Sequence, residues 1–194
     1  MDKSSPHGAD VLIVGGGIAG LALAAALDGS GLSIVLVEAR DFPEAPPASL
    51  RHPADDVCAF DPRVSALTPR SIAFLSSLNV WADIEALRQQ PYTHMTVWDA
   101  EGTGRIDFDA DEVAAQSLGS IVENRLVVAA LVARVRALTS VRLCTAVRLR
   151  DLERAADGFR VHFDDDSSLD AALVVAADGA LSPTRELLGL RTRE

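Results

Sequence analysis

The chain opens with two short apolar runs separated by a segment of small residues. Residues 9–14 and 33–38 are rich in β-branched and other apolar side chains, and residues 18–27 between them are rich in Ala and Leu. Gly29 and Gly31 follow the central segment. Short apolar runs bounded by glycine predict buried strands, and the central segment predicts a helix. The order of strand, helix and strand predicts a parallel βαβ unit.

The next part of the chain predicts a loop and then a helix. Residues 42–56 hold four prolines and few β-branched residues, which is typical of a loop. Residues 68–78 carry an apolar stripe at helical spacing. Thr68 is placed to cap this helix, Pro69 suits its first position, and Asn79 stands where a left-handed residue is expected.

The remaining segments mix antiparallel and parallel signals. Residues 93–99 and 104–108 predict a hairpin, and the acidic residues 107–112 after it predict a solvated loop. Residues 124–138 predict a helix with one apolar face, and Ser182 with Pro183 predicts the start of a last short helix. Four further segments predict strands: 141–144, 147–153, 159–163 and 173–176. The whole pattern predicts an α/β fold with a parallel core and antiparallel insertions.

Composition and charge narrow the class of protein. The chain has 194 residues, of which 48% are hydrophobic, and a formal net charge of −10. The apolar fraction excludes a mainly disordered chain, and the acidic balance argues against a nucleic-acid partner. The two cysteines, Cys58 and Cys144, form no CxxC pair, which excludes a disulfide framework and suits a reducing cytoplasm. The histidines show no metal-ligand spacing, so no metal site is predicted.

Residues 11–27 are the most apolar stretch of the chain. A signal peptide is one interpretation, but Asp2 and Asp10 precede the stretch and four glycines interrupt it. Its 17 residues are also fewer than the roughly 20 that span a bilayer. We therefore expect a cytoplasmic protein that is at most peripheral to a membrane, with any membrane contact made through a partner or a segment beyond Glu194.

A dinucleotide-binding pattern follows the first predicted strand. Gly15, Gly17 and Gly20 match G-x-G-x-x-G: the first permits a tight turn, the second lets backbone amides approach a pyrophosphate, and the third lets the helix pack closely. Glu38 ends the second strand, where a carboxylate can accept hydrogen bonds from both ribose hydroxyls and repel a 2′-phosphate. The pattern predicts a pocket for FAD or NAD rather than NADP, and does not choose between FAD and NAD.

Four segments together carry a family resemblance. They are GGGIAG at 15–20, DPRVSALTPRS at 61–71 with Trp81 after it, IVENRLVVAAL at 121–131, and VVAADGALSPTR at 174–185. With Glu38, they resemble the flavin-dependent aromatic hydroxylases of the para-hydroxybenzoate hydroxylase type. Among these, they look most like the ubiquinone-biosynthesis branch, which hydroxylates polyprenylated phenols. The resemblance runs from Asp10 to about Leu190 and implies a Rossmann-like FAD-binding fold.

The resemblance also implies which residues hold FAD. The glycines would hold the pyrophosphate, Glu38 the adenosine ribose, and the backbone of Val147 would meet the adenine. The implied set is Gly15, Gly17, Ile18, Ala19, Gly20, Glu38, Arg40, Arg63, Ser65, Asn124, Arg125, Val147, Asp178 and Gly179. Simpler roles stay open: Arg63 as a solvated partner of Asp61, Asn124 as a helix cap, Arg125 as a surface residue, and Asp178-Gly179 as a turn. No catalytic side chain is predicted.

The implied activity is hydroxylation of an aromatic ring by an FAD-dependent monooxygenase. This family reduces its flavin with NADH or NADPH, forms a flavin C4a-hydroperoxide with O₂, and transfers the distal oxygen to a phenol. Two other classes stay open. One is a non-catalytic nucleotide-binding module that acts through a partner. The other is an NAD-dependent dehydrogenase, which has no use for the 61–71 and 174–185 segments.

The length of the chain departs from the family pattern. Family members are about twice as long and carry a second, Gly-Asp motif, which is not found near the end of this sequence. We therefore expect residues 1–194 to be the N-terminal portion of an FAD-binding domain, with residues 92–110 starting a substrate-domain sheet and the C-terminal half absent. Such a chain would be inactive or impaired alone. Its uncovered apolar strands would favour self-association or a partner in a biosynthetic complex.

Overall fold

The computed structural model describes residues 8–42 and 60–191. These residues divide into two compact units, one formed by residues 8–42 with 131–191 and the other by residues 60–130. The loop predicted over residues 42–56 lies, apart from Phe42, outside the described residues. Within the described ranges, no helix is long and apolar enough to cross a membrane.

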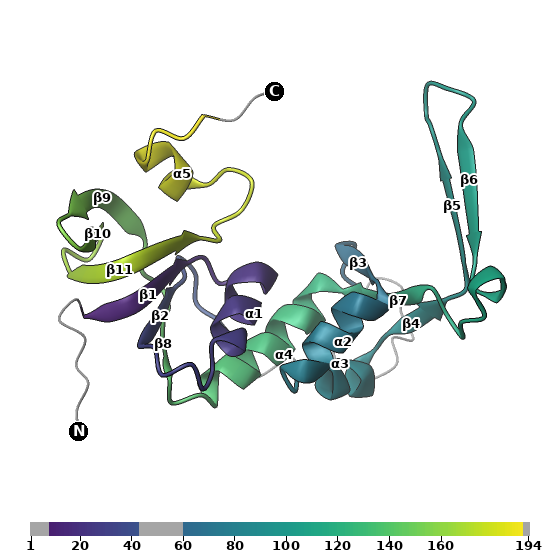
Figure 1. Ribbon diagram of the computed structural model, residues 1–194, viewed down its shortest axis with the longest axis horizontal. Coiled ribbons are helices and arrows are strands. Elements are labelled where there is room, and N and C mark those ends of the chain that lie inside the picture. Colours follow the sequence, from purple (N-terminus) through teal and green to yellow (C-terminus); the bar gives the residue numbers. More distant parts are fainter. Residues whose placement is uncertain (1–7, 43–59, 192–194) are drawn as a thin grey trace. The chain divides into compact units, whose positions relative to one another are not determined.

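The first unit is built on a six-stranded sheet (Figure 1). Four neighbouring strands run parallel, and two more are added antiparallel at one side. The strand order is β8 (Val141–Cys144), β2 (Ile34–Val37), β1 (Ala9–Val14), β11 (Ser168–Ala176), β10 (Gly158–Phe163) and β9 (Leu149–Ala155). Helix α1 (Ile18–Ala26) lies between β1 and β2 in the chain, and α5 (Pro183–Leu187) follows β11. The predicted α/β class, with a parallel core and antiparallel additions, is confirmed.

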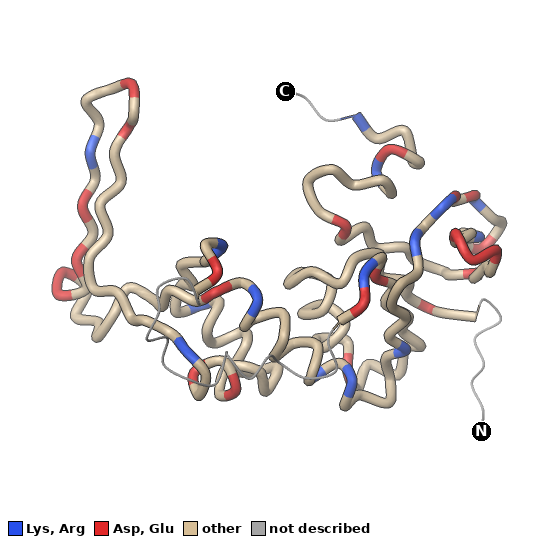
Figure 2. Tube along the Cα trace, turned by 180° about the vertical axis from the view of Figure 1, so that it is seen from behind, with Lys and Arg blue, Asp and Glu red and all other residues tan. Residues whose placement is uncertain are grey.

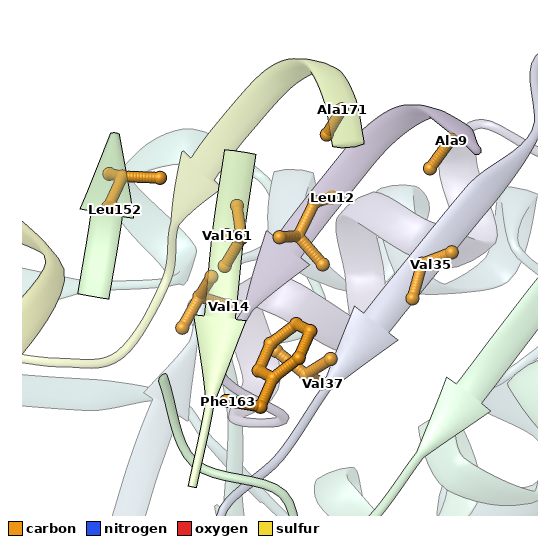
Figure 3. Close-up of a cluster of buried hydrophobic side chains, with 9 residues drawn as sticks. All are labelled: Ala9, Leu12, Val14, Val35, Val37, Leu152, Val161, Phe163 and Ala171. Carbon is orange, nitrogen blue, oxygen red and sulfur yellow. The ribbon is translucent and has the colours of Figure 1, made fainter. Parts of the chain in front are cut away.

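Nine buried side chains form a hydrophobic cluster across this sheet (Figure 3). They come from five strands and are Ala9, Leu12, Val14, Val35, Val37, Leu152, Val161, Phe163 and Ala171. Leu12 and Val14 are two positions apart on β1, which places both side chains on one face of the pleated strand. Val11 and Ile13 alternate with them and are buried as well. β1 is therefore covered on both faces, as is typical of a central strand in a parallel sheet.

The second unit contains a three-stranded antiparallel sheet and a separate hairpin. The sheet order is β3 (Val64–Leu67), β7 (Gly119–Glu123) and β4 (Gln90–Tyr92). Helices α2 (Pro69–Ser77) and α3 (Trp81–Leu87) lie between β3 and β4 in the chain, and a 3₁₀ turn (Asp111–Val113) precedes β7. The predicted hairpin is confirmed as β5 (His94–Trp98) and β6 (Arg105–Asp109). Helix α4 (Asn124–Arg136) follows β7, and its last residues belong to the first unit.

The hairpin has one apolar and one polar face. In the strand register Val97 lies opposite Ile106, and Met95 lies opposite Phe108. Met95, Ile106 and Phe108 each have a polar residue on both sides in the chain. On the other face Asp107 accepts hydrogen bonds from Thr96 and Arg105. Figure 2 shows acidic residues along the hairpin and at its base. Val97, Ile106 and Phe108 are about half exposed, so this apolar face is open to solvent in the described part of the chain. That these strands start a substrate-domain sheet stays a prediction.

Local capping signals in the sequence are confirmed. Thr68 Oγ1 accepts a hydrogen bond from the N–H of Ser71 at 3.3 Å and caps α2, and Ser182 Oγ accepts from the N–H of Arg185 at 3.0 Å and caps α5. Asn79 adopts a φ of 58°, the left-handed conformation expected just after α2.

Several predicted boundaries were wrong. β11 begins at Ser168 rather than at 173, because its polar first residues pair with β10 although their composition is typical of a turn. β9 spans 149–155 rather than 147–153, so Val147 precedes the strand. The hairpin strand predicted over 104–108 is β6 and extends to Asp109, which was expected in the acidic loop. The sequence pattern also gave no prediction for β3, β4, β7 and α3.

Phe163 should dominate the stability of the first unit. Its ring is 5% exposed within the nine-residue cluster, so Phe163→Ala is expected to lower the free energy of unfolding by about 3–5 kcal/mol. Phe108→Ala on the hairpin is the matched control, because that ring is 46% exposed, and a much smaller loss is expected. Urea unfolding followed by far-UV circular dichroism measures both. Equal losses would contradict the placement of the core.

Candidate functional site

A cleft of about 420 Å³ opens at the carboxyl ends of the parallel strands in the first unit. Val14 and Val37, which line it, are the last residues of β1 and β2, and Ala177 directly follows β11. β1 has β2 on one side and β11 on the other, so the strand order reverses there. Ligands of open α/β sheets bind at such a reversal, outside the carboxyl ends of the strands. The volume is also within the usual range for small-molecule sites.

Three glycines shape one wall of this cleft. Gly15 has a φ of +111°, and a Cβ there would lie 2.4 Å from the carbonyl oxygen of Ala177. A Cβ at Gly20 would lie 2.0 Å from the carbonyl oxygen of Gly15, so α1 packs directly against the turn that precedes it. A Cβ at Gly17 would meet nothing within 4 Å. The first and third glycines are therefore required by packing, and the second leaves open space at the cleft.

The N-terminus of α1 provides unpaired backbone donors at this wall. Gly17 is the N-cap of the helix, and no side chain caps it. The first N–H groups of a helix have no acceptor within the helix, and the helix dipole places partial positive charge at that end. A helix start of this kind, reached through a glycine turn, is suited to phosphate oxygens.

Glu38 follows β2 and lines the cleft with its carboxylate. Its Oε2 accepts a hydrogen bond from the N–H of Gly16 at 2.7 Å, and its Oε1 accepts from the N–H of Arg40 at 3.0 Å. The side chain is 12% exposed. A carboxylate has about four acceptor positions, so hydrogen bonds to ribose hydroxyls are compatible with these two. The structure thus adds a second role for Glu38, which is to fix the glycine turn.

Asp178 follows β11 on the opposite side of the cleft. Its Oδ2 accepts a hydrogen bond from the N–H of Thr184 at 2.9 Å, while Oδ1 is buried with no hydrogen-bond partner among the described residues. Burial raises the pKa of Asp178, but hydrogen bonds from Ser182 and Thr184 outweigh it and hold the pKa below its usual value. Asp178 is therefore ionised at neutral pH and fixes the loop before α5.

Ten of the predicted cofactor residues lie in the first unit. Those that line the cleft are Gly15, Gly17, Glu38, Arg40, Val147, Asp178 and Gly179. Ile18, Ala19 and Gly20 form the first turn of α1. The other four residues, Arg63, Ser65, Asn124 and Arg125, lie in the second unit. The structure therefore brings together the predicted residues that surround the glycine turn, and their contacts with a cofactor stay predictions.

The sequence interpretation missed several residues of the cleft. Arg148 and Leu149 line it, and no motif marked them. Pro183 lines it as well, although the sequence predicted it only as the start of a helix. Gly16 does not line the cleft, but packing requires a glycine there, because a Cβ would lie 2.6 Å from the ring of Phe42 and 3.0 Å from Cβ of Glu38. The run of three glycines was the available signal for Gly16, but the G-x-G-x-x-G pattern leaves that position free.

The predicted residues of the second unit form a group of their own. Ser65 Oγ donates a hydrogen bond to Asn124 Oδ1 at 2.6 Å, and the N–H of Asn124 donates to the carbonyl of Arg63 at 2.9 Å. Arg63 is 78% exposed, with its Nε 3.6 Å from Asp61 Oδ1. Asn124 begins α4. The segment around Arg63 and the start of α4 are thus joined directly.

Glu123 is a buried carboxylate next to this group, and the sequence gave no prediction for it. It is the last residue of β7 and is 5% exposed. Its Oε2 accepts from the N–H of Asp61 at 2.7 Å and from Arg125 Nε at 2.8 Å, and Arg88 Nη2 lies 2.6 Å from its Oε1. Burial raises the pKa of Glu123, but the Asp61 amide and the two arginines outweigh burial and lower it below its ordinary 4.5.

Arg88 is held by charge and packing rather than by well-aligned hydrogen bonds. Its side chain is 12% exposed, and its guanidinium lies 4.6 Å from the ring centroid of Phe60. Its nitrogen atoms have no hydrogen-bond partner among the described residues, although Nη2 is within ion-pair distance of Glu123. The ion pair with Glu123 still holds the guanidinium, because charge attraction depends less on alignment than a hydrogen bond does.

Comparison with known proteins identifies the family. The family model described as an FAD binding domain matches residues 8–194. The chain belongs to this family. It is 33% identical over 181 residues to the 3-demethoxyubiquinol 3-hydroxylase of Escherichia coli (strain K12), which covers 93% of this chain and 44% of that protein. It is 35% identical over 185 residues to the ubiquinone hydroxylase UbiL of Rhodospirillum rubrum, covering 95% of this chain and 40% of UbiL. The chain thus spans less than half the length of these relatives.

Solved structures confirm the fold of this FAD binding domain. P. aeruginosa PqsL in complex with 2-aminobenzoylacetate matches 95% of this chain and 47% of its own, with a TM-score of 0.69 and 21% identity. The p-nitrophenol 4-monooxygenase PnpA from Pseudomonas putida DLL-E4 matches 93% of this chain and 43% of its own, with a TM-score of 0.70 and 22% identity. The predicted Rossmann-like FAD-binding fold is confirmed.

Substitution by alanine should destabilise the chain far more at Gly20 than at Gly17. Gly20→Ala is expected to lower the free energy of unfolding by about 1–3 kcal/mol or more, because its Cβ would clash with backbone of Gly15. Gly17→Ala should lower it by less than about 1 kcal/mol, because the Cβ meets open space and only the cap preference changes. Urea unfolding of both variants measures the difference. A larger loss for Gly17→Ala would contradict the geometry of the turn.

Because of Glu123, the free energy of unfolding should fall as the pH is lowered into the acid range. Its folded pKa is lowered, so the ionised carboxylate stabilises the chain above about its ordinary 4.5 and loses this effect as pH falls through the lower folded value. Glu123→Gln is expected to lower the free energy of unfolding by about 3–5 kcal/mol at pH 7. The difference from wild type should shrink progressively below pH 4.5.

The control for this measurement is an exposed ion pair. Asp170→Asn breaks the pair with Arg160, whose side chain is 55% exposed, and should lower stability by less than about 1 kcal/mol. Urea unfolding at several pH values between 3 and 7 measures both variants. A constant effect of Glu123→Gln at every pH would contradict a stabilising charge at position 123.

Proposed function

We propose that the cleft of the first unit binds the adenosine and pyrophosphate portions of FAD. The open space at Gly17, at the uncapped start of α1 and at the carboxyl edge of the sheet, carries this proposal. The residues present suit the group: backbone amides face the space where a diphosphate would lie, and Glu38 offers acceptors for ribose hydroxyls. Asp178, whose buried Oδ1 has no hydrogen-bond partner among the described residues, also lines this cleft.

Each side chain has a distinct task in this proposal. Gly15 and Gly20 keep the helix start close to the strand ends, and Gly17 leaves room for the phosphates. Glu38 disfavours a 2′-phosphate on the same ribose through charge repulsion. Arg63, Ser65, Asn124 and Arg125, which lie in the second unit, stay predicted cofactor residues. A bound flavin supplies the redox chemistry, accepting a hydride from NADH or NADPH and activating O₂. The protein residues orient the groups and keep water out.

The substrate class follows from the relatives rather than from the cleft. The E. coli relative is named as a 3-demethoxyubiquinol 3-hydroxylase and the R. rubrum relative as a ubiquinone hydroxylase. We therefore propose hydroxylation of an aromatic ring, on a polyprenylated phenol, for the protein to which this FAD binding domain belongs. Because such a substrate dissolves in lipid, a cytoplasmic protein would reach it from the membrane surface.

Titration with FAD tests the proposal. The purified chain should bind FAD, quench the fluorescence of added FAD and retain flavin absorbance near about 450 nm after gel filtration. Gly17→Ala is expected to raise the FAD Kd by about tenfold or more, because its Cβ occupies the space proposed for the phosphates. Gly104→Ala in the hairpin turn is the control. A Cβ added at Gly104 would meet only Cβ of Asp99, 3.9 Å away, so the FAD Kd should not change.

Two outcomes would count against the proposal. A folded wild-type chain that fails to bind FAD would remove the function from this chain. If wild type binds FAD and Gly17→Ala binds it equally well, the cofactor lies elsewhere than at the glycine turn.

A further inference from the structure

Glu38 has a fixed place at the edge of the parallel sheet. Its N–H donates to the carbonyl of Cys144 at 2.9 Å, and its carbonyl accepts from the N–H of Val147 at 3.1 Å. These two hydrogen bonds join position 38 to the end of β8 and to the segment that follows β8. The side chain is 12% exposed and lines the cleft. The carboxylate is therefore a well-placed acceptor for groups on either side of it.

The middle of the glycine turn depends on this carboxylate. Residues 15–17 are three consecutive glycines, and glycine has the widest range of backbone conformations. A Cβ at Gly17 would meet nothing within 4 Å, so packing does not restrain that residue. Gly16 is restrained, because its N–H donates to Glu38 Oε2 at 2.7 Å and a Cβ there would lie 3.0 Å from Cβ of Glu38. Glu38 thus fixes the residue that leads into Gly17 and into the start of α1.

We propose that Glu38 is a positioning residue for the diphosphate of the bound nucleotide, because it holds the glycine turn in the conformation that receives the phosphates. This inference rests on the proposed function of the first-unit cleft and uses no residue of the second unit. It adds a task to the acceptance of hydrogen bonds from the ribose. The charge of Glu38 by itself repels phosphate groups, so the positioning effect and the charge effect have opposite signs.

Removing the ribose hydroxyls from the ligand separates the two tasks. ADP carries the ribose and the diphosphate, and 2′,3′-dideoxy-ADP carries the diphosphate without the hydroxyls. Isothermal titration calorimetry with the full chain gives the Kd of both ligands for wild type, Glu38→Leu and Glu38→Gln. Leucine has no acceptor for the N–H of Gly16, whereas glutamine keeps one acceptor oxygen and removes the charge.

The positioning role predicts different results for the two variants. Glu38→Leu should raise the Kd for dideoxy-ADP by about fivefold or more, because the freed glycine turn has to be ordered on binding. Glu38→Gln should bind dideoxy-ADP at least as tightly as wild type, because the turn keeps its acceptor and the repulsion is gone. A carboxylate that served the ribose alone would leave dideoxy-ADP bound to Glu38→Leu at least as tightly as to wild type.

Asp10 offers a matched control in the same unit. Its Oδ2 accepts the N–H of Ser33, also at 2.7 Å, near the amino end of β1, whereas the cleft lies at the carboxyl end of that strand. Asp10→Leu should leave both Kd values unchanged. If Glu38→Leu does not fold, Glu38→Asp serves instead, because its shorter side chain withdraws the acceptor from Gly16 and keeps the charge. It should also raise the Kd for dideoxy-ADP.

The outcomes distinguish the inference from the proposed function. If Glu38→Leu binds dideoxy-ADP as tightly as wild type, the positioning role is overturned and the nucleotide site stands. The same holds if wild type binds FAD or ADP but not dideoxy-ADP, because the hydroxyls then carry the binding. Equal weakening by Asp10→Leu assigns the effect to general loss of structure and also overturns the role. A folded wild-type chain that binds neither FAD nor ADP overturns the proposed function and the inference together.

Discussion

The close approach of α1 to the turn after β1 is the constraint on which the first unit depends. Gly20 lies so near the carbonyl of Gly15 that no side-chain atom fits between them. That contact sets the direction in which α1 leaves the sheet, and with it the place to which the first N–H groups of the helix point. The cleft at the carboxyl edge exists because the helix starts there rather than further from the strands. A packing requirement at two glycines thus determines the electrostatics of the site.

Each unit uses a carboxylate near the end of a strand to hold a neighbouring loop. In the first unit Glu38, just after β2, accepts the N–H of Gly16 and fixes the glycine turn. In the second unit Glu123, at the end of β7, accepts the N–H of Asp61. Backbone donors in loops have no partner in a sheet or helix, and leaving them buried and unpaired is unfavourable. An acidic side chain from an adjacent strand satisfies such a donor and fixes the loop's position at the same time.

The sequence predicted best the features that are local in the chain. The βαβ unit, the glycine turn, the hairpin and the caps at Thr68 and Ser182 each follow from a few consecutive residues, and the structure confirms them. β11 was predicted too short because the residues at its start become a strand only by pairing with β10, as Leu169 does with Val161. Glu123 lies in the 121–131 segment, but its role was not predicted for the same reason, since its partners include residues 61 and 88 and the sequence does not show that they meet.

The arrangement around Glu123 is better explained by position than by stability. Two arginines surround one carboxylate, so the buried group carries excess positive charge, and Arg88 depends on the ring of Phe60 as well as on the ion pair. Buried ion pairs of this kind are often no more stabilising than apolar side chains of the same size. An apolar side chain at position 123, however, would leave the N–H of Asp61 buried without an acceptor. The need to satisfy that one backbone donor therefore requires an acceptor here, and the arginines provide the charge that keeps the acceptor ionised.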